Sequence, residues 1–204
     1  MREMIAGRSS IKRRQDRVAG PALPGALSSQ AGFTIIELMI VVTIMGVIAA
    51  IAAPSLRTMI ITNQVRAATS DLLNDLAVSR SEASKRSQRV VMCASTDMST
   101  CAGSAWGSGW ISFVDANNNQ QRDTVDATEP LIRVKEAAPV SVKIVTTPSA
   151  LSKVGFRSFG IIDATKTFTI CPATLGTGIA GRSITMNTMG RVQTVNATTS
   201  ACES

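Results

Sequence analysis

The side chains able to do chemistry are few, and their types argue against an enzyme. The sequence has no histidine and no tyrosine. Histidine is the commonest general base, the usual partner of a serine or cysteine nucleophile and the commonest metal ligand. No nucleophile and base pair is recognisable elsewhere, so nothing in the chain assembles an active site. We therefore expect a protein that is not an enzyme and that needs no cofactor.

One carboxylate is notable because of its surroundings. From Ile35 to Ala53 the sequence runs through nineteen residues with a single charge, Glu37. A helix of this length, at about 1.5 Å per residue, spans roughly the hydrocarbon core of a bilayer. An acid toward the bilayer interior costs on the order of 2.5–3.5 kcal/mol, so Glu37 needs a partner. A cut between Gly32 and Phe33 would create an amino terminus about one helical turn before Glu37, which could offset its charge.

Basic residues precede this apolar segment. Residues 1–32 hold six basic and two acidic side chains, so +4 of the net charge of +7 lies there. The positive-inside rule then keeps the N-terminus in the cytoplasm and places everything after Pro54 outside. Without residues 1–32 the chain is only mildly basic.

These residues carry a resemblance to a known family. The run Ala31-Gly32-Phe33-Thr34-Ile35-Ile36-Glu37-Leu38, followed by the apolar stretch and Pro54, resembles the prepilin signature of type IV pilins and type II secretion pseudopilins. The resemblance implies that a prepilin peptidase cuts after Gly32, that Phe33 becomes N-methylated and that Glu37 guides subunit docking. It implies as partners other pilins or pseudopilins, the peptidase and the assembly platform of the bacterial inner membrane. The signature is shared by pili and secretion pseudopili.

An ordinary secretory signal is the alternative interpretation of the same segment. Ala50-Ile51-Ala52 resembles a small-x-small cleavage site, and a cut after Ala52 would release a soluble protein. The glutamate within the apolar run and the long leader argue against this alternative. The first residue of the mature chain, Phe33 or Ala53, distinguishes the two.

The elements that position these residues follow from the periodicity. After Pro54, apolar residues recur at spacings of three and four, which predicts an amphipathic helix to about Lys85. Pro54 lacks an amide hydrogen, so we expect it to kink the helix or to mark a local break. From Arg89 onward, short runs rich in β-branched residues alternate with turn residues, which predicts antiparallel strands. The predicted buried helix positions are Val65, Ala68, Leu72, Leu76, Ser79 and Ala83, and the predicted strands are 90–94, 110–114, 131–134, 140–145, 167–171, 183–187 and 191–195.

Motifs in the C-terminal region narrow the resemblance. Ser81-Glu82-Ala83 leading to 89–93, the run 110–115, and Gly190-Arg191-Val192 make this region similar to the minor pilins and pseudopilins called FimT and GspH. We therefore expect a pilin-like α+β fold, in which a long N-terminal helix packs on an antiparallel β-sheet head. The expected parts are a leader (1–32), a membrane and assembly half of the helix (33–54), an amphipathic half (55–86) and a periplasmic head (87–204).

Four cysteines, Cys93, Cys101, Cys171 and Cys202, all follow the apolar segment. An even number in an exported region favours two disulfides, and four cysteines permit three pairings. Proximity in the sequence favours Cys93 with Cys101. That leaves Cys171 with Cys202, a pair that would pin the C-terminal tail to a strand.

A run of Asp and Asn residues is similar to a calcium-binding loop. Oxygen-bearing side chains stand at alternate positions. However, Gln120 stands where such loops have glycine, and the last acid is aspartate rather than glutamate. A polar hairpin loop is therefore the favoured interpretation and calcium the alternative. The candidate ligands are Asp115, Asn117, Asn119, Asp123 and Asp126.

DNA binding is a second function suggested by the resemblance. FimT-like members that bind DNA are associated with a Gly-Arg-x-Arg motif, and here Gly190 and Arg191 are followed by Val192 and Gln193. The glutamine removes a phosphate contact of the kind that dominates nonspecific affinity. For a head so weakly basic, solvated surface residues are the favoured interpretation. The candidate DNA-binding residues are Arg182 and Arg191, with Lys166 and Arg157 as contributors.

Overall fold

The computed structural model describes residues 32–125, 127–174 and 178–202 of the 204-residue chain. The chain divides into two compact units at Thr43/Ile44, inside the long helix α1 (Ile35–Arg86). The first unit contributes the beginning of α1. The second contains the rest of α1, eight strands and two short 3₁₀ helices, η1 (Trp106–Ser108) and η2 (Thr199–Cys202). The predicted leader, apart from Gly32, lies outside the described residues.

The second half of α1 presents one buried stripe. Val65, Ala68, Leu72, Leu76 and Ala83 are 6% exposed or less, as the periodicity predicts. Ser79 is buried as well, and its hydroxyl donates to the carbonyl of Asp75 at 2.7 Å, which pairs this polar group within the core. The helix continues through Pro54 without a break.

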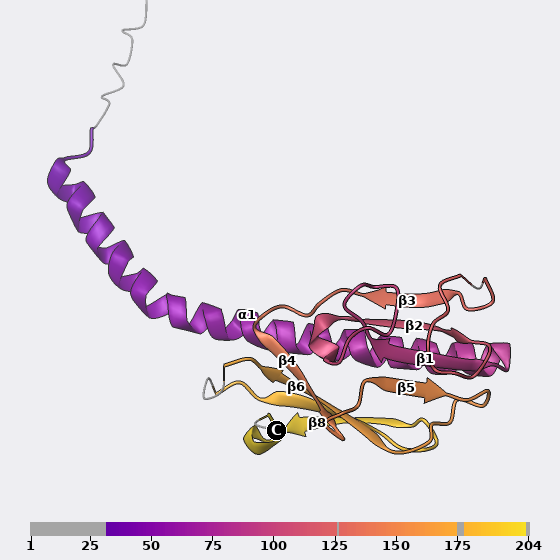
Figure 1. Ribbon diagram of the computed structural model, residues 1–204. Coiled ribbons are helices and arrows are strands. Elements are labelled where there is room, and N and C mark those ends of the chain that lie inside the picture. Colours follow the sequence, from indigo (N-terminus) through magenta and orange to yellow (C-terminus); the bar gives the residue numbers. More distant parts are fainter. Residues whose placement is uncertain (1–31, 126, 175–177, 203–204) are drawn as a thin grey trace, which may run out of the picture. The chain divides into compact units, whose positions relative to one another are not determined.

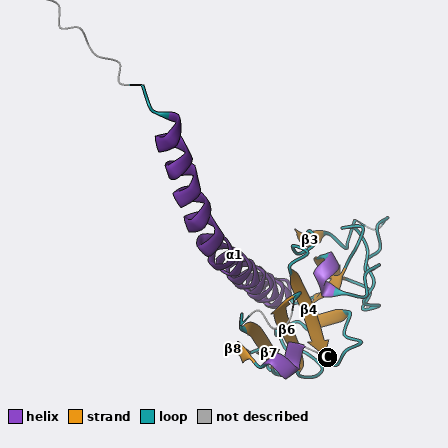
Figure 2. Cartoon of the chain, turned by 90° about the vertical axis from the view of Figure 1, so that its left-hand side faces the viewer, coloured by secondary structure: helices purple, strands orange, loops and turns teal. Residues whose placement is uncertain are grey.

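The strands form two four-stranded sheets in which every pairing is antiparallel. The first has the order β3 (Leu131–Lys135), β2 (Trp110–Asp115), β1 (Arg89–Ala94) and β5 (Lys153–Phe156). The second has the order β4 (Val142–Thr147), β6 (Lys166–Pro172), β7 (Gly181–Met186) and β8 (Val192–Ala197). Figure 1 labels β1 to β6 and β8 beside the packed part of α1, and Figure 2 shows β4, β6, β7 and β8 grouped together with β3 apart from them.

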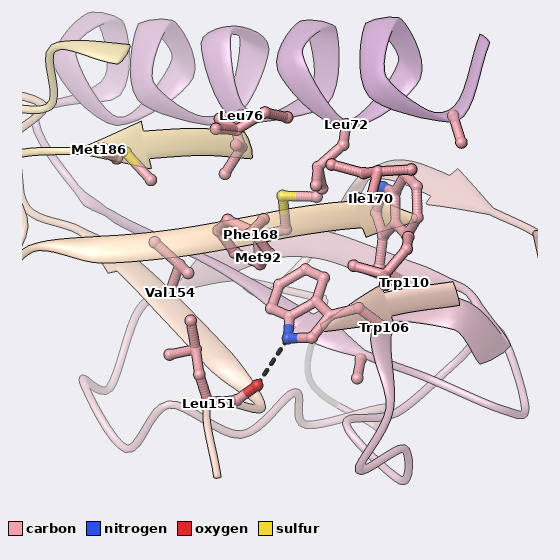
Figure 3. Close-up of a cluster of buried hydrophobic side chains, with 14 of the residues drawn as sticks. Leu72, Leu76, Met92, Trp106, Trp110, Leu151, Val154, Phe168, Ile170 and Met186 are labelled. Atoms are coloured by element: carbon pink, nitrogen blue, oxygen red, sulfur yellow. Dashed lines mark hydrogen bonds between the residues drawn. The ribbon is translucent and has the colours of Figure 1, made fainter. Parts of the chain in front are cut away.

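The core lies where the helix stripe meets both sheets. Leu72 and Leu76 face Met92 on β1 and Phe168 on β6 (Figure 3). The ring of Trp106 meets the edge of Phe168 at 4.8 Å between centroids, a favourable aromatic geometry. Its indole nitrogen donates to the carbonyl of Leu151 at 2.7 Å, which satisfies the one polar atom of this buried ring (Figure 3).

A smaller apolar cluster covers the other face of the first sheet. Val91 and Cys93 on β1 pack with Ile111 and Phe113 on β2, and all four are fully buried. Cys101 forms a disulfide with Cys93 and packs on this cluster. The loop after β1 therefore closes the outer face of the sheet. A second disulfide joins Cys171 on β6 to Cys202 in η2 and ties the end of the chain to the second sheet.

The predicted strands are present, with ends shifted by one or two residues, and one strand was missed. The strand expected from residue 140 begins at Val142, because a turn closed by the Val142 amide and the Pro139 carbonyl precedes it. Val140 is fully exposed. The missed strand, β5, has four residues including Gly155, too few to show an alternating pattern.

Candidate processing and assembly site

The beginning of α1 is defined by a local capping interaction. The hydroxyl of Thr34 accepts a hydrogen bond from the Glu37 amide at 3.3 Å, and the Thr34 carbonyl accepts one from the Leu38 amide at 3.2 Å. Thr34 and Glu37 thus occupy the first and fourth positions of a Thr-x-x-Glu pattern that often starts helices. The carboxylate also lies in the first turn, where the helix dipole favours negative charge. This capping signal is visible in the sequence as Thr34-Ile35-Ile36-Glu37.

Gly32 and Phe33 precede the helix and are accessible. Both are exposed, and the Phe33 side chain is 80% exposed. A Cβ atom added to Gly32 would meet no other atom within 4 Å. Among the described residues, therefore, no packing contact requires glycine at this position. A requirement for glycine would have to come from a partner that binds the extended segment.

The apolar side chains of the first half of α1 are not covered by any of the residues that the structure describes. The large hydrophobic side chains from Ile35 to Ile60 are about half exposed or more. In the part of the chain that the structure describes, α1 is the helix long and apolar enough to cross a membrane. A patch of this size is stable only against lipid or other apolar surfaces. The hydroxyls of Thr43 and Thr58 donate to the carbonyls of Met39 and Pro54, so they do not oppose such burial.

Glu37 is the one charged residue of the apolar run from Ile35 to Ala53. It is exposed, and its carboxylate forms no ion pair or hydrogen bond with any of residues 32–202 that the structure describes. The proposed partner, an amino terminus at Phe33, belongs to the processed form of the chain. Phe33 lies just before α1 and four residues before Glu37, a spacing equal to about one helical turn.

The residues proposed for DNA binding are not brought together. On the β7–β8 hairpin, Arg182 pairs with Asn196, whereas Arg191 lies at the turn at the opposite end. Lys166 begins β6 and lies toward the turn end, since it pairs with Met186. Arg157 forms an ion pair with Asp163. DNA binding through Arg191 stays a prediction of the resemblance.

Gly190 has a packing role that does not involve a ligand. Its φ is +71°, and an added Cβ would lie 2.2 Å from the carbonyl oxygen of Gly160. Arg80 on α1 donates from Nε to Gly160 at 3.1 Å and from Nη2 to the carbonyl of Met189 at 3.0 Å. The glycine before Arg191 is therefore needed for two loops and the helix to meet.

The comparison that decides the family covers the head. Residues 68–190, more than half of the chain, match the family model described as "Type II transport protein GspH". The chain belongs to the GspH family. Residues 27–53 of this GspH-family protein match the "Prokaryotic N-terminal methylation motif", which includes the Gly32–Phe33 junction and Glu37. It is accordingly a minor pilin or pseudopilin, a structural subunit of a type IV pilus or type II secretion system, and not an enzyme.

The fold of the GspH-family protein is shared by a solved structure. The type IV minor pilin FimU of Pseudomonas aeruginosa (strain PAO1) aligns with a TM-score of 0.51 at 23% identity, over 68% of this chain and 91% of that chain. The minor pseudopilin EpsH from the type 2 secretion system of Vibrio cholerae aligns at 0.47 with 9% identity, over 65% and 97% of the two chains. No curated protein sequence matches. The predicted pilin-like α+β fold is confirmed by the likeness to FimU.

Proposed function

We propose that the chain is cut between Gly32 and Phe33 by a prepilin peptidase, methylated on the new amino group of Phe33, and held in the bacterial inner membrane by α1 before it enters a filament. The observation that carries this proposal is the methylation motif over residues 27–53, in a segment where Gly32 is open and Phe33 is exposed. A peptidase needs an accessible extended segment, and the helix capped by Thr34 begins just beyond it.

Glu37 has an assembly role in this proposal. A carboxylate without a partner is costly to bury in lipid or among apolar helices. The amino terminus created at Phe33, on the same or a neighbouring subunit, supplies the opposite charge. The apolar surface of α1 then packs against other pilins or pseudopilins. In this proposal the membrane assembly platform also binds the apolar surface of α1.

The proposed orientation of the chain in the membrane rests on the charge of the leader and on the disulfides of the head. The basic residues of the leader favour a cytoplasmic N-terminus. Both disulfides lie in the head, and disulfides persist in oxidising compartments such as the periplasm. We therefore place the head on the periplasmic side of the membrane.

Mass spectrometry of the protein purified from its native membrane tests the processing step. We expect a mature chain that begins with N-methylated Phe33, and Gly32→Val should leave the leader attached. A chain that begins at Ala53 would instead establish the secretory-signal alternative.

Incorporation of a tagged copy into sheared filaments tests the role of Glu37. Glu37→Ala should be cut and retained in the membrane but should enter filaments at least about tenfold less, because a paired charge worth roughly 1–2 kcal/mol would be lost. Glu82→Ala removes an acid at the other end of α1 and is the matched control. Equal incorporation of Glu37→Ala and the control would contradict the proposed role.

A further inference from the structure

The loop between β2 and β3 is built around two buried carboxylates. Asp115 ends β2 and is 1% exposed, and Glu129, two residues before β3, is fully buried. Buried carboxylates are normally paired with a cation or a metal, since an isolated buried charge is very unfavourable. Neither forms an ion pair with any lysine or arginine among the described residues. The question is what neutralises them.

Asp115 has one oxygen that is satisfied and one that is not. Oδ2 accepts the Gln120 amide at 3.1 Å, so the carboxylate points into the loop. Oδ1 is buried and has no hydrogen-bond partner among the described residues. Buried acceptors in native proteins are nearly always satisfied, so Oδ1 is an acceptor that can take a further ligand.

Glu129 closes the loop from its other end. Its Oε1 accepts the Ala116 amide at 3.2 Å and its Oε2 accepts the Asp123 amide at 2.7 Å. Because Ala116 follows Asp115 directly, these bonds hold the Glu129 carboxylate next to the start of the loop. Each Glu129 oxygen keeps a lone pair after accepting one amide.

The nearby cationic side chains are used elsewhere or stand at the rim. Arg122 donates to the carbonyls of Glu129 and Ser99, and Lys153 donates to the carbonyl of Gln120. Arg89 is opposite Asp115 in the β1–β2 register, and the two residues line one pocket of about 340 Å³ together with Ala116, Asn118 and Arg157. The alternative to a bound metal is therefore that Arg89 neutralises the charge of Asp115.

The rest of the loop supplies neutral oxygen atoms. The side-chain oxygen of Asn117 accepts the Asn119 amide at 3.0 Å, and that of Asn119 accepts the Gln121 amide at 2.7 Å. Both residues are exposed, and each of these oxygen atoms keeps a lone pair after accepting one amide. Gln120 has a φ of +59°, so it adopts the left-handed conformation for which a calcium loop uses glycine. The missing glycine therefore does not exclude the loop shape.

We propose that this loop binds a divalent cation, Ca²⁺, through Oδ1 of Asp115, the side-chain oxygens of Asn117 and Asn119, and the carboxylate of Glu129. Two carboxylates match the charge of one divalent cation. The residues that the structure describes contain no group of three His, Cys, Asp or Glu side chains that could hold a metal. Amide oxygens complete the set, which suits a hard cation and not zinc.

In the proposed site Glu129 takes the place of Asp123 and Asp126, the later acidic ligands that the sequence suggested. Asp126 lies outside the described residues, and Asp123 is an exposed residue that contributes its backbone amide to Glu129. Ca²⁺ accepts an irregular set of oxygen ligands, whereas Mg²⁺ demands near-octahedral geometry. We therefore expect binding of Ca²⁺ in preference to Mg²⁺.

The test uses the full chain in detergent, stripped of metal with EDTA. Calorimetric titration with CaCl₂ should give about one site per chain, and Ca²⁺ should raise the unfolding temperature by several degrees, because ligands stabilise the state they bind. Asp115→Asn and Glu129→Gln should each weaken binding by at least about tenfold, since ligand charge sets affinity. Glu136→Gln, which neutralises an exposed acid after β3, is the matched control and should bind as the unmodified chain does.

A second measurement separates a metal site from a structural acid. In EDTA, Asp115→Asn should unfold at the same temperature as the unmodified chain or above it, because it removes an uncompensated buried charge. If Arg89 neutralises Asp115 instead, Asp115→Asn will be less stable both with and without calcium. That outcome, or the absence of a calcium-dependent shift in the unmodified chain, would overturn the proposal.

Discussion

Asp75 on α1 accepts a hydrogen bond from the indole nitrogen of Trp110 on β2 at 2.8 Å. Its other oxygen pairs with Arg133 on β3 at 3.0 Å, so that one carboxylate joins the helix to two neighbouring strands. The residue is 6% exposed. A buried carboxylate with two donors fixes the angle at which α1 lies on the first sheet, because apolar contacts alone are not directional.

Removing this carboxylate should destabilise the head. Asp75→Ala leaves the buried indole N–H without an acceptor, and we expect a loss of about 2–3 kcal/mol in the free energy of unfolding. Urea unfolding of the chain in detergent, followed by tryptophan fluorescence, measures it. Asp71→Ala is the matched control, since Asp71 forms an ion pair with Lys135 in which both side chains are about 40% exposed. The control should lose under about 1 kcal/mol. Equal losses would show that the Asp75 carboxylate contributes no more to the free energy of unfolding than a surface ion pair does.

Gly190 should tolerate no side chain. Gly190→Ala combines an unfavourable φ, worth about 1–2 kcal/mol, with a collision against the backbone of Gly160. The overpacking should add roughly 1–3 kcal/mol. Gly178→Ala is the control, because Gly178 has nearly the same φ, +70°, with open space around it. The difference between the two variants in the same unfolding experiment isolates the contact with Gly160 and Arg80, and no difference would refute it.

Whether a structural feature could be predicted from the sequence depends on how far apart in the chain the interacting residues lie. The buried stripe of α1 was predicted because burial at Leu72 and Leu76 follows the helical repeat. Asp75 lies on the same buried side, but its partners are 35 and 58 residues away, and nothing local reveals them. In the same way, β5 is defined by pairing with β1 rather than by its own four residues.

The same distinction between neighbouring and distant residues applies to the candidate sites. Gly32, Phe33 and Glu37 could be recognised because the processing motif is contiguous. Glu129 was missed because its carboxylate reaches the loop only through the amides of Ala116 and Asp123. The separation of Arg182 from Arg191 depends on the register of a hairpin, which the sequence does not specify.

The two disulfides should differ in their contribution to stability. Cys171 and Cys202 enclose a longer loop than Cys93 and Cys101, with sequence separations of 31 and 8. The chain-entropy relation gives about 3.7 kcal/mol for the longer loop and about 2.5 kcal/mol for the shorter one. Unfolding of the two double-alanine variants measures the difference. Only loss of Cys171–Cys202 should make the C-terminal residues sensitive to carboxypeptidase, and sensitivity in both variants would argue against a local tether.

Asp97 should make the free energy of unfolding of the head depend on pH. The hydroxyl of Thr100 donates to Asp97 at 2.6 Å, and the amides of Thr100 and Ser99 donate as well, so these bonds hold the pKa of Asp97 well below its usual range. A carboxylate whose pKa is lowered in the folded state contributes stability that is fully present above its unfolded pKa, about 3.9, and is lost as the pH falls toward the folded pKa. Asp97→Asn should therefore be less stable than the unmodified chain at neutral pH, and the difference should shrink as the pH falls below about 4. Thr100→Val removes the strongest donor and should raise the pKa of Asp97 toward its ordinary value, as measured by NMR titration of the carboxyl carbon. An unchanged pKa in Thr100→Val would mean that the remaining donors, the two backbone amides and the Ser95 hydroxyl, set it.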